Sequence, residues 1–405
     1  MNFTQVNKPC DAAVPRAGTC DNLTGENKLM AGHMEESSYL PRQALQTLFD
    51  TLKTQGFRTL GPVVRDGAIQ YLDLTDAGQL PSGWTDEQSP GRYRLSKAES
   101  VRCFAWATGP QALKPYLFSA RETLWRSERG PNGHLAFTAQ TIERRPMAVV
   151  GVRACDLAAL ELQDRHFLDG IRDPAYAARR EGLFIVALHC SHPADICFCA
   201  STGDGPRATR GFDLALSELD DGYLVETGSE RGRGVARQLP LQPATPAQRQ
   251  QAEREISDAA KRQSRELPSQ NLREALFGRL EHPHWDKVAA RCLACGNCTN
   301  VCPTCFCHAE QDVPELGGAS SEHMREWDSC FSEGHSYLHG FLVRPETRHR
   351  YRQWLTHKLG SWHDQFGRSG CVGCGRCITW CPVGIDITQE ATAICSDDGM
   401  PGGAA

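Results

Sequence analysis

Two cysteine runs near the C-terminal end of this 405-residue chain limit what it can fold into more than any other feature. The first, CLACGNCTNVCPTCFC, occupies residues 292–307, and the second, CVGCGRCITWCP, occupies residues 371–382. In both runs three cysteines follow the spacing C-x-x-C-x-x-C, and a fourth comes after three further residues, directly before a proline. The chain holds 19 cysteines in all. In a chain of this size without a secretory signal, such tight clusters indicate metal sites rather than disulfides.

The spacing is typical of iron–sulfur proteins with two cubane clusters. Three thiolates on a tight loop can reach three corners of one cube, and the fourth cysteine, on the following turn, reaches the other cube. Gly296, Gly373 and Gly375 let the loops turn their N–H groups toward cluster sulfurs. Tetrahedral zinc needs only four ligands, usually in paired C-x-x-C groups, so two complete runs disfavour it. The sequence therefore predicts two [4Fe-4S] clusters, one on Cys292, Cys295, Cys298 and Cys381 and the other on Cys371, Cys374, Cys377 and Cys302.

Four further cysteines lie next to two apolar segments of the N-terminal half. Residues 148–152 (AVVGV) and 182–190 (GLFIVALHC) are expected to be buried strands separated by a helix, which predicts a right-handed βαβ unit and a parallel sheet. Because neighbouring parallel strands end side by side, cysteines that follow them are expected in one crevice. We expect a third [4Fe-4S] cluster there; zinc and buried cysteines without a ligand role are the alternatives. The four are Cys155, Cys190, Cys197 and Cys199.

Other patterns complete the expected fold. A helix is predicted to start near Ser37–Ser38, a hairpin over 58–74 to turn at Asp66-Gly67, and a second hairpin over 212–228 to turn at Asp221-Gly222. Residues 303–370, which lie between Cys302 of the first run and Cys371 of the second, are expected to be helical. The predicted fold class is an α/β N-terminal domain with a parallel sheet core, followed by a helix-rich, two-cluster ferredoxin-like C-terminal domain. The predicted parts are a flexible tail (1–35), the α/β domain (36–230), a linker arm (231–275), the dicluster domain (276–395) and a C-terminal tail (396–405).

Several classes of function are disfavoured. The formal net charge is −5 and no long basic stretch occurs, so a nucleic-acid partner is not expected. The longest apolar runs are too short to span a bilayer, and the N-terminus lacks the pattern of an export signal, so we expect a cytoplasmic protein. No G-x-G-x-x-G follows a strand and no G-x-x-x-x-G-K-[ST] occurs, which indicates that the chain lacks a nicotinamide or flavin site of its own. A chain with several clusters and no substrate site is expected to relay electrons.

A few cysteines and histidines stay outside these assignments. Cys10, Cys20, Cys103 and Cys395 are expected to be free thiols without a ligand role. Surface or packing positions are expected for His308, His323, His335 and His339. The remaining thiols either tune a cluster, form a further site or pack; they are Cys305, Cys307 and Cys330.

Taken together, GVRACDLAAL, CFCASTGDGP, GFDLALSELDDGYLVETGSERG, CLACGNCTNVCPTCFC, WDSCF and GCVGCGRCITWCP resemble one family. It is the beta subunit of cytosolic sulfhydrogenases, which are NAD(P)-linked nickel–iron hydrogenases with sulfur reductase activity. The resemblance covers about residues 37–392, and the sequence is also similar to the iron–sulfur subunit of anaerobic sulfite reductase.

The resemblance implies a non-catalytic, iron–sulfur electron-transfer subunit of an oxidoreductase complex. Its expected partners are a flavin- and NAD(P)-binding subunit on one side and the hydrogenase small and large subunits, or a sirohaem reductase subunit, on the other. Two alternatives come from other classes. One is a zinc-binding scaffold protein, and the other is a redox enzyme that reduces sulfur species with its own cluster.

Overall fold

The computed structural model describes residues 37–142 and 144–396. The predicted N-terminal tail, with Cys10 and Cys20, and all but Ser396 of the predicted C-terminal tail lie outside the described residues. By their internal contacts, the described residues belong to one compact unit. No helix among the described residues is long and apolar enough to cross a membrane.

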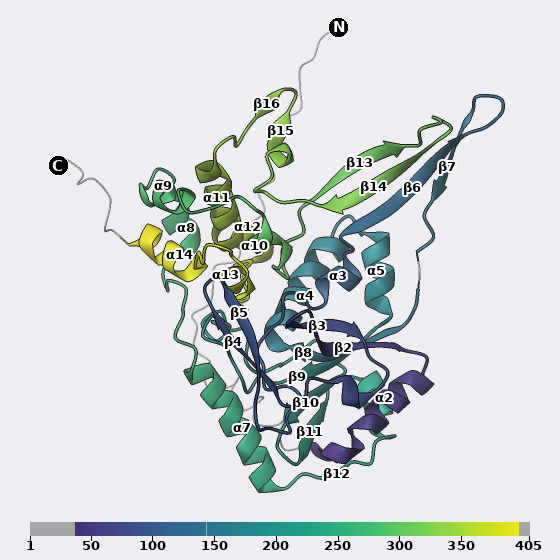
Figure 1. Ribbon diagram of the computed structural model, residues 1–405, viewed down its shortest axis with the longest axis vertical. Helices are drawn as coiled ribbons and strands as arrows, with labels where there is room; N and C mark the ends of the chain where they lie inside the picture. The colour runs from purple at the N-terminus through teal and green to yellow at the C-terminus, as the bar shows by residue number, and fades with distance from the viewer. Residues whose placement is uncertain (1–36, 143, 397–405) are drawn as a thin grey trace, which may run out of the picture. The chain divides into compact units, whose positions relative to one another are not determined.

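An eight-stranded mixed sheet forms the centre of the N-terminal half (Figure 1). Its strands are β1 (Ser38–Pro41), β2 (Arg58–Arg65), β3 (Ala68–Asp73), β8 (Met147–Arg153), β9 (Leu183–Leu188), β10 (Leu214–Glu218), β11 (Gly222–Thr227) and β12 (Gln242–Pro243). They are arranged in the order β12-β1-β11-β10-β9-β8-β2-β3. The four strands β2, β8, β9 and β10 run parallel, which confirms the predicted core. Antiparallel strands extend this core on both sides, and the predicted fold class did not include them.

Two helices connect the central strands β8 and β9. They are α4 (Ala154–Leu168) and α5 (Pro174–Glu181), and in Figure 1 both lie above the sheet while α2 (Leu45–Thr54) lies below it. Every residue of β8 and β9 is buried, as expected for strands of a parallel sheet covered on both faces. The predicted strand–helix–strand unit is therefore confirmed.

The two predicted hairpins are also confirmed. Asp66 and Gly67 have φ angles of 52° and 73° between β2 and β3, the left-handed pair that a two-residue turn of this kind requires. The other hairpin joins β10 to β11, but it turns at Asp220-Asp221, one residue before the predicted Asp221-Gly222, because Leu219 and Gly222 already pair with each other. The prediction of a helix from Ser37–Ser38 is wrong at its start, because Ser38 pairs with Val225 in β1 and the α-helix begins at Leu45.

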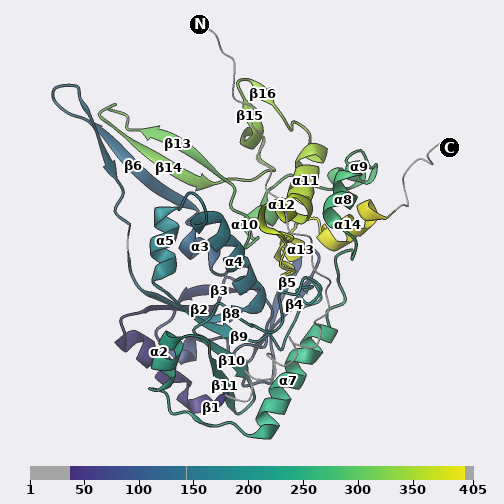
Figure 2. The ribbon, with the colours of Figure 1, turned by 180° about the vertical axis from the view of Figure 1, so that it is seen from behind.

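The segment between the cysteine runs differs from the helical expectation. Its first half forms β13 (His308–Pro314) and β14 (Ser320–Trp327), which join β6 (Arg121–Arg129) and β7 (Leu135–Ala139) in a four-stranded antiparallel sheet. Figure 2 shows the β6–β7 and β13–β14 hairpins extending together away from the eight-stranded sheet. The local composition of β14 is compatible with a helix, but β6 supplies ladder partners for residues 320–326, with one register shift between His323 and Met324, from about 200 residues away in sequence. Only the second half of the segment is helical.

Short elements build the C-terminal part and the connections. In the C-terminal part these are α8 (Leu272–Phe277), α9 (His284–Ala289), α10 (Asn297–Asn300), η3 (Gly334–Ser336), β15 (Tyr337–Leu338), β16 (Phe341–Leu342), α11 (Thr347–Thr356), the π-helical η4 (His357–Ser361), α12 (Trp362–Phe366), α13 (Arg376–Thr379) and α14 (Ile387–Cys395). The connections are η1 (Arg42–Ala44), η2 (Ala77–Gln79), β4 (Trp84–Ser89), β5 (Arg92–Lys97), α3 (Lys114–Leu117), α6 (Glu230–Ala236) and α7 (Pro246–Lys261). The expected linker arm, 231–275, thus contains most of α6, all of α7 and the start of α8.

Candidate metal centre

One pocket gathers cysteines from both runs. Cys292 follows α9, Cys298 lies in α10, and Cys381 follows α13, so the two runs meet although 68 residues lie between Cys302 and Cys371. Ala294 and Gly296 have φ angles of 51° and 75°, which turn the first loop tightly around the pocket. The pocket is lined by the full predicted first ligand set, Cys292, Cys295, Cys298 and Cys381, together with Cys377 of the second run.

Most of the other residues that line this pocket are apolar, and Asn297 is the polar exception. Its wall includes Leu293, Phe331, Tyr351, Trp354, Val383, Ile385 and Ile387. Two backbone groups point at its thiols: the N–H of Ala294 donates to Cys292 Sγ at 3.4 Å, and the N–H of Ile385 donates to Cys381 Sγ at 3.3 Å. Four thiols, backbone donors to sulfur and a largely apolar wall are the chemistry that an iron–sulfur cluster needs from its surroundings.

The predicted second set lies beside the first. Burial raises the pKa of Cys371 to about 12 and also raises the pKa values of Cys374 and Cys377; in all three the neighbouring Cys302 adds to the shift. Cys302, a cysteine of the first run, therefore lies close to these three cysteines of the second run. A hydrogen bond from Cys305 lowers the pKa of Cys302.

A lysine lies against this second set. The Nζ atom of Lys358 lies 3.5 Å from Cys302 Sγ and donates to Thr304 Oγ1 at 2.7 Å. Its side chain is buried. The cation thus directly faces a sulfur of the predicted second ligand set.

The glycines of the second run pack against a loop from the N-terminal half. Gly373 and Gly375 have φ angles of 64° and 73°, and a Cβ at Gly373 would lie 2.5 Å from the backbone of Phe198. A Cβ at Gly375 would lie 2.2 Å from Ile196 Cδ1. The N–H of Phe198 donates to the carbonyl of Gly373 at 2.9 Å. Only glycine allows this approach, which brings the second run to the loop that carries Cys197 and Cys199.

The third predicted set comes together at the ends of β8 and β9. Cys155 lies in the first turn of α4, and Cys190 follows β9, the positions that the strand arrangement predicted. Burial raises the pKa of Cys155, Cys197 and Cys199, the last to about 12. Cys199 also raises the pKa of Cys155, and Cys190 raises those of Cys197 and Cys199, so the four thiols form one connected group.

The four thiols of the third predicted set also lie next to the second set. Cys374 contributes to the raised pKa values of Cys155, Cys197 and Cys199, and it packs with Cys155 and Cys199 in one buried cluster. A thiol must lose its proton to ligate iron, so filling such buried sites releases protons. No three Cys, His, Asp or Glu side chains are arranged to hold a single metal ion in the part of the chain that the structure describes.

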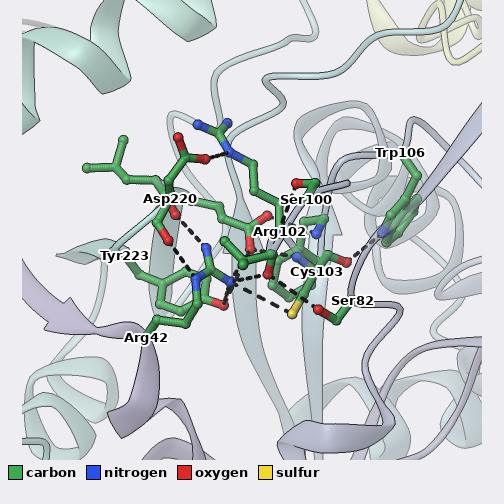
Figure 3. Close-up of polar contacts among 12 residues, drawn as sticks. Arg42, Ser82, Ser100, Arg102, Cys103, Trp106, Asp220 and Tyr223 are labelled. Atoms are coloured by element: carbon green, nitrogen blue, oxygen red, sulfur yellow. Dashed lines mark hydrogen bonds and ion pairs between the residues drawn. The ribbon is translucent and has the colours of Figure 1, made fainter. Parts of the chain in front are cut away.

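Cys103 lies in a polar network away from these sets. Figure 3 shows Arg42 reaching toward Cys103, Asp220 and Tyr223. The Nη1 atom of Arg42 lies 3.9 Å from Cys103 Sγ, and the N–H of Cys103 donates to Glu218 Oε1 at 2.7 Å. This network joins the loop of Cys103 to the β10–β11 hairpin, which is a structural role.

Sequence reasoning missed the surroundings of His335. It was expected to be a surface or packing histidine, yet its ring contacts both Asp328 and Cys307. The proximity of Cys330 and His335 within the stretch DSCFSEGH was the available signal. The pairing of β13 with β14 places Cys330 and His335 beside Cys307. His323, in contrast, stacks on Trp125 as expected of a packing histidine.

Comparisons with known proteins agree with this geometry. A family model described as a 4Fe-4S dicluster domain matches residues 291–385, the part that contains both cysteine runs. The chain is also similar to the sulfhydrogenase 2 subunit beta of Pyrococcus furiosus. The two are 35% identical over 239 residues, which cover 58% of this chain and 70% of that relative. No solved structure matches the chain.

Proposed function

We propose that this chain, which belongs to the family of sulfhydrogenase beta subunits, relays electrons through three [4Fe-4S] clusters. The first cluster would be held by Cys292, Cys295, Cys298 and Cys381, the second by Cys371, Cys374, Cys377 and Cys302, and the third by Cys155, Cys190, Cys197 and Cys199. When bound, each cluster supplies a site that takes up and releases one electron.

The observation that carries this proposal is the exchange of cysteines between the two runs. Cys381 lines the pocket of the first run, and Cys302 lies among the thiols of the second. This crossing supports two adjacent four-thiol sites, because each run contributes three cysteines to one site and one to the other. The third set lies next to the second, because Cys374 is near enough to Cys155 to raise its pKa. A chain of close sites is what stepwise electron transfer requires.

The residues around these sites have distinct roles in the proposal. Apolar side chains such as Trp354 would keep water from the first site, and backbone N–H groups would stabilise negative charge on its sulfurs. Lys358 would do the same at the second site through its positive charge.

The proposed partners are the small and large subunits of a nickel–iron hydrogenase, together with a flavin- and NAD(P)-binding subunit. We propose a cytoplasmic location, because exposed and clustered thiols persist in reduced form in a reducing compartment. We also propose that 36–230 and 276–395 are two domains joined by the arm 231–275. The second candidate of the same class is the iron–sulfur subunit of an anaerobic sulfite reductase, whose partner would be a sirohaem protein. Co-purification of the complex distinguishes the two by its nickel or sirohaem content.

Iron and sulfide analysis of anaerobically purified protein tests the relay. Three cubane clusters predict about twelve irons per chain, with absorbance near 400 nm. Four or fewer irons per chain would refute the proposal. A colourless protein that contains zinc would favour the scaffold alternative. Turnover of a sulfur compound by the isolated chain would instead favour an enzyme that works without partners. Cys395→Ser is the matched control, because this buried thiol lies outside all three sets.

A further inference from the structure

Two cysteines outside the three predicted sets meet where the β13–β14 ladder ends. Cys307 directly precedes β13, and the N–H of Asp328, which directly follows β14, donates to the carbonyl of Cys307 at 3.0 Å. The chain then curls so that the thiol of Cys330 forms a hydrogen bond with the thiol of Cys307. Two cysteines more than 20 residues apart in sequence are thereby held as a contacting pair.

A histidine and a carboxylate complete this group. Asp328 Oδ2 lies 2.6 Å from His335 Nδ1, and the same imidazole forms a hydrogen bond with Cys307. The N–H of Ser329 donates to the other carboxylate oxygen of Asp328 at 2.7 Å, which fixes its orientation. A thiol that faces an imidazole held by a carboxylate is the arrangement that activates a cysteine nucleophile.

The two thiols differ in charge and in exposure. The hydrogen bond from Cys330, followed by that with His335, lowers the pKa of Cys307 to about 4 against the opposing effect of burial. The hydrogen bond with Cys307 and burial raise the pKa of Cys330. Cys307 is partly exposed, whereas Cys330 is buried. A partly exposed thiolate next to a buried, protonated thiol is the composition of an attacking and a resolving cysteine.

We propose that Cys307 and Cys330 form a redox-active dithiol that reduces low-molecular-weight disulfides, with Asp328 and His335 positioning the attacking sulfur. The thiolate of Cys307 attacks one sulfur of the substrate R–S–S–R′ and forms a mixed disulfide, while R′S⁻ leaves and takes a proton. Cys330 then loses its proton and attacks Cys307 Sγ, which releases RS⁻. The products are two substrate thiols and the Cys307–Cys330 disulfide. Reduction back to the dithiol consumes two electrons and two protons, which a small dithiol supplies in vitro.

The pair is distinct from the cysteines proposed as ligands, although Cys298 of the first set is near enough to raise the pKa of Cys330. In sequence, Cys307 lies five residues beyond Cys302, and Cys330 lies in the insert between the two runs. One part of this inference rests on the proposed function: within the chain, the proposed clusters would supply the electrons that reduce the Cys307–Cys330 disulfide again. The thiol exchange itself needs none of them.

Glutathione disulfide tests the pair in the full-length, anaerobically purified protein. After reduction with dithiothreitol and its removal, addition of glutathione disulfide should release two glutathione molecules per chain. Mass spectrometry of acid-quenched peptides should then show a disulfide between Cys307 and Cys330. In Cys330→Ser the reaction should stop at glutathione bound to Cys307, with one glutathione released. In Cys307→Ser neither product should form, and Cys395→Ser should behave as the unchanged protein.

Iron content, measured on the same samples, separates this inference from the relay. Unchanged iron in Cys307→Ser and Cys330→Ser is expected, and loss of about four irons in either would overturn the inference, because the residue would then be a cluster ligand. Failure of Cys330→Ser to trap glutathione on Cys307 would overturn it as well. A protein with little iron that still forms the disulfide would refute the relay and leave the thiol pair standing.

Discussion

The guanidinium of Arg376 and the carboxylate of Asp156 form a two-point ion pair, with N–O distances of 2.6 and 2.9 Å. Arg376 opens α13 between two cysteines of the second run, and Asp156 follows Cys155 in α4. Both side chains are almost fully buried, with 1% and 2% of their surface exposed. The Nε atom of Arg376 also donates to the carbonyl of Gly109 at 2.9 Å. This pair ties the second run to the sheet half of the chain.

Breaking this pair should destabilise the protein strongly. Asp156→Asn leaves the Arg376 charge buried without its partner, which typically costs about 3–5 kcal/mol. We expect a clear fall in the thermal unfolding midpoint, followed anaerobically by circular dichroism. Arg210→Met removes an ion pair with Glu161 whose side chains are 73% and 47% exposed, and it should cost less than about 1 kcal/mol. Equal effects of the two changes would contradict this prediction.

Lys358→Met should lower the reduction potential of one cluster. Reduction adds negative charge next to Cys302, and the ammonium group 3.5 Å from its sulfur stabilises that charge. A loss of about 1.4 kcal/mol corresponds to about 59 mV for a one-electron couple. An electron paramagnetic resonance titration should show one of the signals shifted to a more negative potential. Lys261→Met, at an exposed site at the end of α7, is the control and should shift none.

Two neighbouring cysteines of the first run should differ in their effect on iron content. Cys302 lies with Cys371, Cys374 and Cys377, so Cys302→Ser should cost about four irons per chain. Cys305 contacts Cys302 without belonging to a predicted set, so Cys305→Ser should keep its iron. Metal analysis of both variants checks this prediction. Loss of iron from Cys305→Ser alone would assign the ligand role to Cys305 instead of Cys302.

Alkylation of Cys307 should depend little on pH. Its pKa is lowered to about 4, so its thiolate fraction is complete above about pH 6, whereas an ordinary thiol with a pKa near 8.5 gains reactivity as pH rises. Iodoacetamide labelling, read by peptide mass spectrometry between about pH 6 and 9, should therefore give a flat profile at this position. The titratable groups facing Cys307 are Cys330, His335, His357, Lys114 and His166.

The matched variant for this profile is His335→Gln. Loss of the imidazolium removes a hydrogen bond and a positive charge that both favour the thiolate, so the pKa of Cys307 should rise. The labelling rate should then fall more at the acidic end of the profile than at the basic end. A rate reduced by the same factor at every pH would indicate altered access rather than a positioning role for the histidine.

Local sequence predicted the central strands and the turns well. The strands β8 and β9 are continuous apolar runs, and Asp66-Gly67 supplies the two left-handed residues of a tight hairpin. These features depend on neighbours in sequence, so their patterns are readable without the rest of the chain. In contrast, β14 pairs both with its sequence neighbour β13 and with the distant β6, and nothing local indicates the second partner.

By itself, the sequence determined which cysteines are available for the two ferredoxin-type sites, because ligand spacing along a loop is a local property. It also predicted the crossing of Cys302 and Cys381 to the opposite run; in the structure Cys302 lies near Cys377, and Cys381 lines the pocket of the first run. Only the tertiary structure decided how the third set meets the second, since that contact depends on Gly373 and Gly375 packing on a distant loop. The same holds for Cys307, Cys330 and His335, which strand pairing brings together. These two sets of contacts between distant segments arise from packing and strand pairing, and no local pattern encodes them.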